Sequence, residues 1–241
     1  MNAVINLMQP LEQLNNEGTI LLEQGRFEEA IETLALALKA AKKNAAEQEP
    51  VNDESNVLRR PAPTGHRKQM VILMPPLPAR HFLSSQSEIQ ANIEGLCFCL
   101  VKLSEEDCFS DHNVTAVVES FTAILYNLAL AYHLHATFGV CTVSGRSSSR
   151  HRAKTLYEMA YEISMQSKET LMNLNVTMMI VNNLGHVHSE LGNATPAEKC
   201  FKHLLSTVMY LRSINANSTI DYAFIHNTSR LVLRESGAPA A

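Results

Sequence analysis

A spacing of small residues recurs near the two ends of the chain. Gly18 and Gly25 lie seven positions apart, as do Gly185 and Gly192. In each copy an alanine follows the second glycine by five positions, and large apolar residues follow that alanine at intervals of four. Helices approach each other closely only where side chains are small, and a glycine in the left-handed conformation commonly ends a helix. Each copy therefore predicts two antiparallel helices joined by a short turn.

The middle of the chain contains a third copy of this pattern, interrupted by extra residues. Leu128 and Ala129 correspond to Leu184 and Gly185, and Tyr132 follows them. The small and aromatic positions of the second helix then fall at Ala153, Tyr157 and Ala160. The pattern therefore predicts three helical hairpins in order along the chain.

These patterns resemble the tetratricopeptide repeat, a helix–turn–helix unit of about 34 residues. The first copy departs from the family pattern at Glu17, where leucine is usual, and the third departs at Leu204, where a small residue is usual. The resemblance implies an all-α fold, a solenoid of about three helical hairpins with a C-terminal capping helix. In such a solenoid each hairpin leaves an apolar face that the next hairpin covers.

The resemblance and the local composition divide one domain, residues 1–241, into consecutive segments. We expect repeat one at about 11–44, a proline-rich basic insertion at about 45–113, repeat two at about 114–166 with an inserted loop at 137–149, repeat three at about 169–213, and a capping helix at about 219–234. Within the insertion, Met70–Met74 is a candidate strand, whereas Ile89–Leu103 fits either a helix or a second strand. The insertion therefore has room for a short β-hairpin.

Two inserted segments have the composition of short recognition motifs. Pro75–Arg80 fits the polyproline form that Src-homology-3 domains bind, although such short matches are mostly accidental. Gly145–Arg152 is basic and rich in serine, so it is either a site of phosphorylation or, as we favour, a flexible connection between two helices. The sequence does not decide whether other proteins recognise either segment.

Charge and cysteine content exclude several classes of protein. The formal net charge is −4 and the pI is about 6.2, whereas a nucleic-acid-binding surface is normally basic. The five cysteines form no C-x-x-C pair, which argues against a disulfide framework and against a zinc ribbon. We see neither a signal peptide nor an apolar run of membrane-spanning length. We therefore expect a cytoplasmic protein, or alternatively a nuclear one, without nucleic-acid or membrane partners.

The histidines of the third repeat raise the question of a metal site. His186 and His188 are two positions apart, so on a helix they point about 200° away from each other and cannot share an ion. A metal shared between His133 and His186, on neighbouring helices, is geometrically possible. We favour the alternative that His188 is buried and His186 faces the inner side of the solenoid, and we expect no metal and no cofactor.

The resemblance places the first helix of each repeat along the inner, concave face. The residues that we expect to line this groove and to bind a partner are Asn15, Asn16, Tyr126, Asn127, His133, Asn182, Asn183, His186 and Glu190. An asparagine precedes the Leu-Gly pair or its equivalent in every copy, and amides both donate to and accept from an extended peptide backbone. Helix packing is an equally good explanation for these asparagines. None of the groove residues is basic, which argues against the clamp that chaperone-tail-binding members use.

We interpret the chain as a non-enzymatic scaffold or adaptor that binds a protein, through a peptide or helix, in the concave groove. The alternative is a metal-binding or enzymatic protein that uses the groove histidines. The chain is also similar to uncharacterised single-celled-algal repeat proteins that end in a similar Asn-Thr-Ser-x-Leu-x-Leu tail, a resemblance that implies no activity. The sequence leaves the partner, the pathway and the oligomeric state open.

Overall fold

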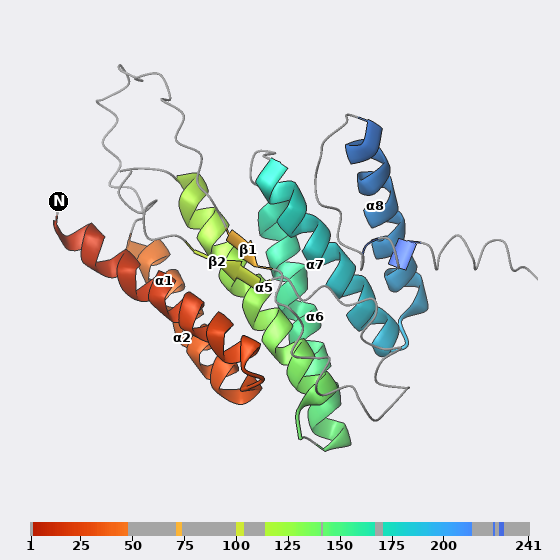
Figure 1. The fold of residues 1–241 in the computed structure, drawn as a ribbon, viewed down its shortest axis with the longest axis horizontal. Helices are drawn as coiled ribbons and strands as arrows, with labels where there is room; N and C mark the ends of the chain where they lie inside the picture. The colour runs from red at the N-terminus through yellow and green to blue at the C-terminus, as the bar shows by residue number, and fades with distance from the viewer. Residues whose placement is uncertain are drawn as a thin grey trace, which may run out of the picture.

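In the part of the chain that the structure describes, three helical hairpins are stacked side by side (Figure 1). The computed structural model describes residues 2–47, 71–73, 100–103, 114–140, 142–166, 171–213, 224, 227 and 228. The helices are α1 (Asn2–Glu23), α2 (Phe27–Glu47), α5 (Val114–Phe138), α6 (Val143–Gln166), α7 (Leu171–Glu190) and α8 (Ala194–Ser213). The predicted all-α helical-hairpin solenoid is confirmed.

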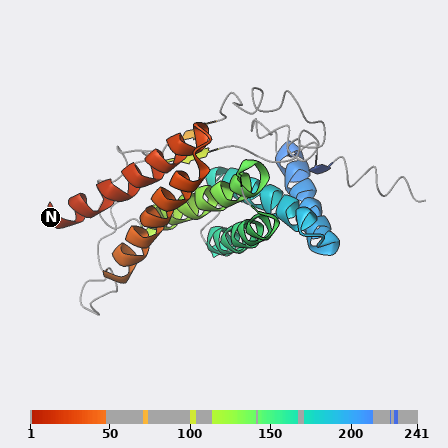
Figure 2. The same ribbon diagram turned by 90° about the horizontal axis from the view of Figure 1, so that it is seen from below.

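The hairpins are arranged so that each one packs on the next. Within the hairpins α1 contacts α2, α5 contacts α6 and α7 contacts α8, whereas α2 packs on α5 and α6 packs on α7 between them. The first helices also contact one another, α1 with α5 and α5 with α7. Figure 2 shows α2 and α6 on one side of this row and the strands β1 and β2, described below, on the other.

The turns of the first and third hairpins have the same construction. Gly25 has a φ of 74° and Gly192 a φ of 76°, which is the left-handed region that favours glycine. In the first turn, Arg26 N donates to Leu21 O and Gly25 N donates to Leu22 O, both at 3.0 Å. The third turn repeats both bonds. These paired bonds are the Schellman motif, which satisfies the last free carbonyls of the helix.

The helices of these two hairpins touch where the sequence has glycine. A Cβ atom on Gly18 would lie 2.5 Å from Cγ of Leu34, and one on Gly185 would lie 2.7 Å from Cε1 of Phe201. Leu34 is fully buried, as is Ala30 beside it. The small residues of the repeat therefore make room for one large side chain from the opposite helix.

The central hairpin differs from the prediction. We expected an inserted loop at 137–149, but α5 runs to Phe138 and α6 begins at Val143, so the extra residues lengthen the helices. Thr142 caps the N-terminus of α6, because its Oγ1 accepts a hydrogen bond from Gly145 N at 3.2 Å. From there α6 buries one helical face at Ser149, Ala153, Tyr157, Ala160 and Ser164. This spacing holds the serine-rich segment in a helix.

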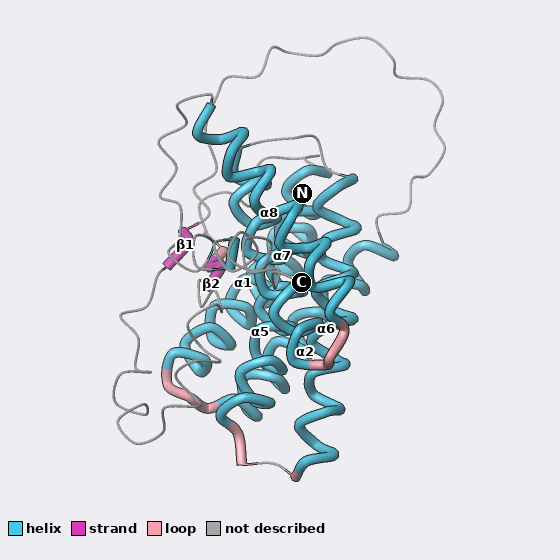
Figure 3. Tube along the Cα trace, turned by 90° about the vertical axis from the view of Figure 1, so that its right-hand side faces the viewer, coloured by secondary structure: helices cyan, strands magenta, loops and turns pink. Residues whose placement is uncertain are grey.

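The insertion contributes an antiparallel pair of short strands, β1 (Val71–Leu73) and β2 (Leu100–Lys102). Val71 lies opposite Lys102, and Leu73 lies opposite Leu100. Figure 3 shows the pair at one face of the helical layers, and β2 contacts both α1 and α5. The candidate strand within Met70–Met74 is therefore present, and of the two alternatives for Ile89–Leu103 the described residues Leu100–Lys102 form a strand. Residues 74–99 lie outside the described residues, as does the segment Pro75–Arg80.

Of the predicted capping helix at 219–234, the structure describes only Phe224, Asn227 and Thr228, which are helical and buried. The rest of that prediction lies outside the described residues. One further expectation needs correction: Val117–Phe138, within α5, is long and apolar enough to span a membrane by length and composition. Within the hydropathy window that meets this test, 67% is buried inside the protein, as expected for a helix packed between two hairpins.

Candidate functional site

The first group of predicted site residues holds the backbone of β2. Asn127 Nδ2 donates to Val101 O at 2.7 Å, and its Oδ1 accepts from Val101 N at 3.1 Å. Asn15 Nδ2 donates to the same carbonyl at 3.0 Å. Asn16 makes the equivalent pair with Leu103, through bonds of 2.8 Å to its O and 2.9 Å from its N. Three side-chain amides on two helices therefore bind an extended segment through its main chain.

Side-chain contacts complete the binding site of β2, which we call the seat of β2 and which includes Asn15, Asn16, Glu23 and Asn127. The Val101 side chain is fully buried, and Leu100 is 3% exposed. Lys102 Nζ lies 3.5 Å from Glu23 Oε1 at the end of α1, with both side chains partly exposed. Asn127 Nδ2 also donates to Asn15 Oδ1 at 2.9 Å, which ties the two recognition amides together. This binding site therefore fits an extended segment in which an apolar residue is followed by a cation.

The second group forms a buried polar network between the second and third hairpins. Asn183 Nδ2 lies 3.3 Å from the Tyr157 hydroxyl and 3.4 Å from that of Tyr126, and donates to them. Asn182 Nδ2 donates to Asn183 Oδ1 at 3.1 Å, and Asn182 Oδ1 accepts from Asn227 Nδ2 at 2.7 Å. Both asparagines are fully buried. This network joins α7 to the C-terminal segment and serves packing.

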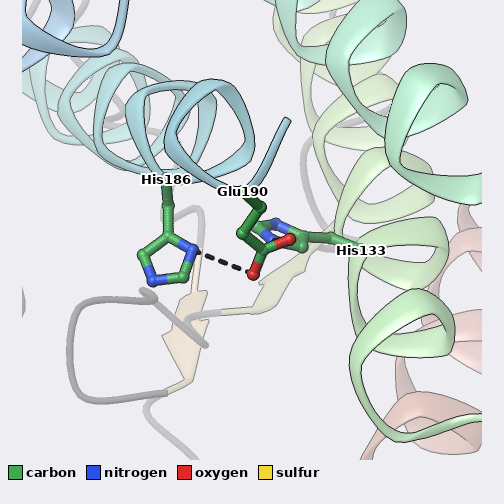
Figure 4. A group of neighbouring side chains, drawn as sticks. All are labelled: His133, His186 and Glu190. Carbon is green, nitrogen blue, oxygen red and sulfur yellow. Dashed lines mark ion pairs between the residues drawn. The ribbon is translucent and has the colours of Figure 1, made fainter. Parts of the chain in front are cut away.

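The third group brings His133 of α5 together with His186 and Glu190 of α7 (Figure 4). His133 Nε2 lies 3.3 Å from Glu190 Oε2, and His186 Nδ1 lies 3.3 Å from Glu190 Oε1. Arg150 of α6 donates from Nε to Glu190 Oε2 at 2.7 Å. One ligand atom from each of the three grouped residues lies within 4.8 Å of the others.

Burial decides the electrostatics of this third group. Full burial is the main reason why the pKa of His133 is lowered, and Glu190 acts in the opposite direction with less weight. For Glu190, burial raises the pKa, but the closeness of the two histidine rings outweighs it, so the net pKa is lowered. Glu190 is therefore a carboxylate at neutral pH, and the His133 ring is neutral. Two imidazoles facing a carboxylate are a donor set for a divalent ion.

The predicted groove residues are not an open surface in this structure. Asn15, Tyr126, Asn127, His133, Asn182, Asn183 and His186 are buried, whereas Asn16 and Glu190 are partly exposed. The chain's own β2 covers the asparagines of α1 and α5, and Asn227 reaches Asn182 from the C-terminal segment. His186 is buried as well as His188, so we correct the expectation that only one of them would be. A partner that binds the asparagines has to replace a segment of the chain itself.

Two contributors were missing from the predicted site. Arg150 escaped notice because its segment was interpreted as a loop, although the buried positions of α6 recur at helical spacing. Val101 lies in the insertion, and only its apolar neighbours hinted at a buried strand. The sequence does contain a signal that joins Glu190 to His186, because the two are four residues apart and so lie on one helix face.

Comparison with known proteins agrees with this construction. The tetratricopeptide repeat family model matches residues 14–44 and 180–207, which lie in the first and third hairpins. Neither the curated proteins nor the solved structures give a match to the chain. The two matched segments, the repeated Schellman turns and the stacked hairpins together show that the chain contains tetratricopeptide-like repeats.

Proposed function

We propose that the protein is a non-enzymatic interaction module that binds an extended peptide of a partner protein across α1 and α5. Tetratricopeptide repeats generally mediate protein–protein interaction and are typically non-enzymatic. The observation that carries the finer proposal is the pair of bonds between Asn127 and both backbone groups of Val101. A side chain that bonds both the N–H and the C=O of one residue can bind an extended backbone whatever its sequence.

The neighbouring contacts define which segment fits best. The buried position of Val101 requires an apolar side chain, and Glu23 favours a cation at the position of Lys102. Each backbone hydrogen bond contributes about 1 kcal/mol to binding, and burying a valine side chain contributes roughly 1.5–3 kcal/mol. The partner segment is therefore an extended stretch with an aliphatic residue followed by lysine or arginine.

In this proposal β2 is a ligand supplied by the chain itself. An intramolecular ligand competes with a free peptide at an effective concentration that a connecting segment sets, typically in the millimolar range for short flexible linkers. A partner peptide consequently binds weakly until β2 leaves its seat. The asparagines serve binding, and the insertion that carries β2 sets how readily the seat becomes free.

The test replaces the internal ligand in the full-length chain. Val101→Pro removes the N–H that donates to Asn127 and disfavours β2 in its seat. The probe is a fluorescent peptide with the sequence of residues 98–106, with serine in place of Cys99, and fluorescence anisotropy measures its binding. We expect the Val101→Pro protein to bind this peptide at least tenfold more tightly than the wild type. Equal binding by both proteins, or by neither, contradicts the proposal.

Matched variants distinguish binding through the asparagines from non-specific binding of the peptide. Asn127→Ala in the Val101→Pro background should abolish binding, while a peptide with glutamate at the position of Lys102 should bind more weakly because it faces Glu23. Ser206→Ala, at an exposed position of α8, is the control and should leave the affinity unchanged. Circular dichroism of each variant verifies that the helices remain folded. Selection from a random peptide library on the Val101→Pro protein should enrich aliphatic–basic pairs.

A further inference from the structure

We propose that His133, His186 and Glu190 form a binding site for a divalent transition-metal ion of the zinc type, at the junction of the second and third hairpins. The site is separate from the seat of β2 and does not depend on peptide binding. Its three ligands come from two helices, with His186 and Glu190 four residues apart on α7 and His133 on α5. Residues four apart on a helix share a face, so both α7 side chains point toward α5.

The distances fit an ion of this size. Zinc bonds to histidine nitrogen and carboxylate oxygen at about 2.0–2.2 Å, so neighbouring ligand atoms in a tetrahedral site lie roughly 3.4 Å apart. His133 Nε2 and His186 Nδ1 each lie 3.3 Å from an oxygen of Glu190. The ligand atoms of all three residues lie within 4.8 Å of one another. Small side-chain rotations therefore place them around one ion, with a fourth position for water.

Buried ring nitrogens of His133 and His186 lack a well-formed hydrogen bond within the described residues, and a bound ion would provide a partner for them. The His133 ring is fully buried, and neither of its nitrogens makes a hydrogen bond of good geometry within the described part of the chain. The same holds for Nδ1 of His186, which faces Glu190. Buried polar atoms are nearly always partnered, so such nitrogens directed at one carboxylate need an explanation. A bound cation accepts one lone pair from each ring.

Arg150 limits how tightly this site binds. Its guanidinium donates to Glu190 Oε2 and leaves Oε1, the oxygen that faces His186, for the ion. The positive charge of Arg150 repels a cation, yet its bond fixes the orientation of the carboxylate, as partners of metal ligands commonly do. Arg150 is 28% exposed and Glu190 10% exposed, so the site opens to solvent on this side. An ion therefore has a route of entry past Arg150.

The experiment uses the full-length protein, stripped of metal with a chelator and titrated with Zn²⁺ in competition with a chromophoric chelator. A parallel titration with Co²⁺ records the visible spectrum, in which thiolate ligands give an intense charge-transfer band. We expect one ion per chain and a cobalt spectrum without that band, because no cysteine belongs to the site. Glu190→Gln and His186→Gln should each weaken binding at least tenfold. Arg150→Gln should tighten it several-fold, since a repelling charge is removed.

Controls distinguish this site from other histidines and cysteines. His151→Gln removes an exposed histidine of α6 and should leave the zinc affinity unchanged. Circular dichroism without metal verifies that the variants are folded, and Arg150→Gln tests the site without removing a ligand. The proposal is overturned if no stoichiometric ion binds, if cobalt shows thiolate ligation, or if folded Glu190→Gln and His186→Gln proteins bind zinc as the wild type does.

Discussion

The terminal hairpins and the central hairpin reach the same fold by different means. The turns α1–α2 and α7–α8 each have a left-handed glycine with two Schellman bonds, and the family matches fall on these hairpins. The turn α5–α6 has no such glycine among the described residues and begins its second helix with the cap of Thr142. The difference teaches that the buried helical faces specify the stack, while the glycine signature specifies the turns.

The central hairpin contributes residues to both candidate sites. Asn127 and His133 belong to α5, and Arg150 belongs to α6. Both α5 residues are fully buried, because α5 contacts helices of both terminal hairpins. The hairpin that departs most from the repeat pattern is thus the one on which the two candidate sites depend. The terminal hairpins complete these sites, with Asn15 and Asn16 of α1 at β2 and His186 and Glu190 of α7 beside His133.

The largest effect is expected in a terminal hairpin. Ala197 is 5% exposed at the contact of α8 with α7, so Ala197→Arg forces a charged side chain into a space that holds a methyl group. We expect the free energy of unfolding to fall by about 4 kcal/mol or more. Urea denaturation followed by circular dichroism measures this. Ala194→Arg, at an exposed position of the same helix, should change stability by less than about 1 kcal/mol.

The next prediction compares equivalent asparagines. Asn127→Ala leaves both buried backbone groups of Val101 without their bonds to Asn127, which should cost about 3 kcal/mol. Asn183, its counterpart in the third hairpin, donates long bonds of 3.3–3.4 Å to two hydroxyl groups and accepts one of 3.1 Å from Asn182. Asn183→Ala should therefore cost less, about 1–2 kcal/mol. Equal losses of unfolding free energy for the two variants would show that the asparagine serves packing in both hairpins.

The hairpins could be predicted from the sequence because their signals are local. Glycine spacing specifies a turn within a few residues, and burial at helical intervals specifies a face. The close approach of Gly18 to Leu34 follows from the same pattern. The length of α6 could have been inferred too, since Ser149, Ala153 and Tyr157 continue one face. The serines and Gly145 of this segment favour a loop instead, because both residue types have low helix propensity.

The sites could be predicted only in part, because they depend on contacts between distant segments. Binding of an extended backbone was one of two equal interpretations of the amides, and nothing local to Asn127 indicates that Val101, far along the insertion, supplies that backbone. Likewise, His133 and His186 were recognised as neighbours through the repeat register, whereas Arg150 was not. The exposure of the groove residues was predicted least well, because a concave face is open only if no other part of the chain covers it.

A smaller effect is expected at the two left-handed glycines. Gly25→Ala and Gly192→Ala force alanine into a conformation with φ near 75°, although no atom lies within 4 Å of the added methyl group. Each substitution should lower the unfolding free energy by about 1 kcal/mol, because backbone strain is the sole cost. Denaturation curves of the two variants should agree closely. A large difference between them would contradict the equivalence of the terminal hairpins.

The smallest effect concerns a thiol that reports on the docking of the third hairpin against the second. Burial raises the pKa of Cys200 to about 11, and the carboxylate of Glu158 on α6 adds to the shift. Since the ordinary pKa is 9.0 and the thiolate is the reactive form, alkylation at pH 8 should be roughly a hundredfold slower than for an ordinary thiol. Peptide mapping by mass spectrometry measures the rate at Cys200. Glu158→Gln should raise it by only a few-fold, since burial is the larger cause, and no change at all would mean that α6 and α8 are further apart than the structure places them.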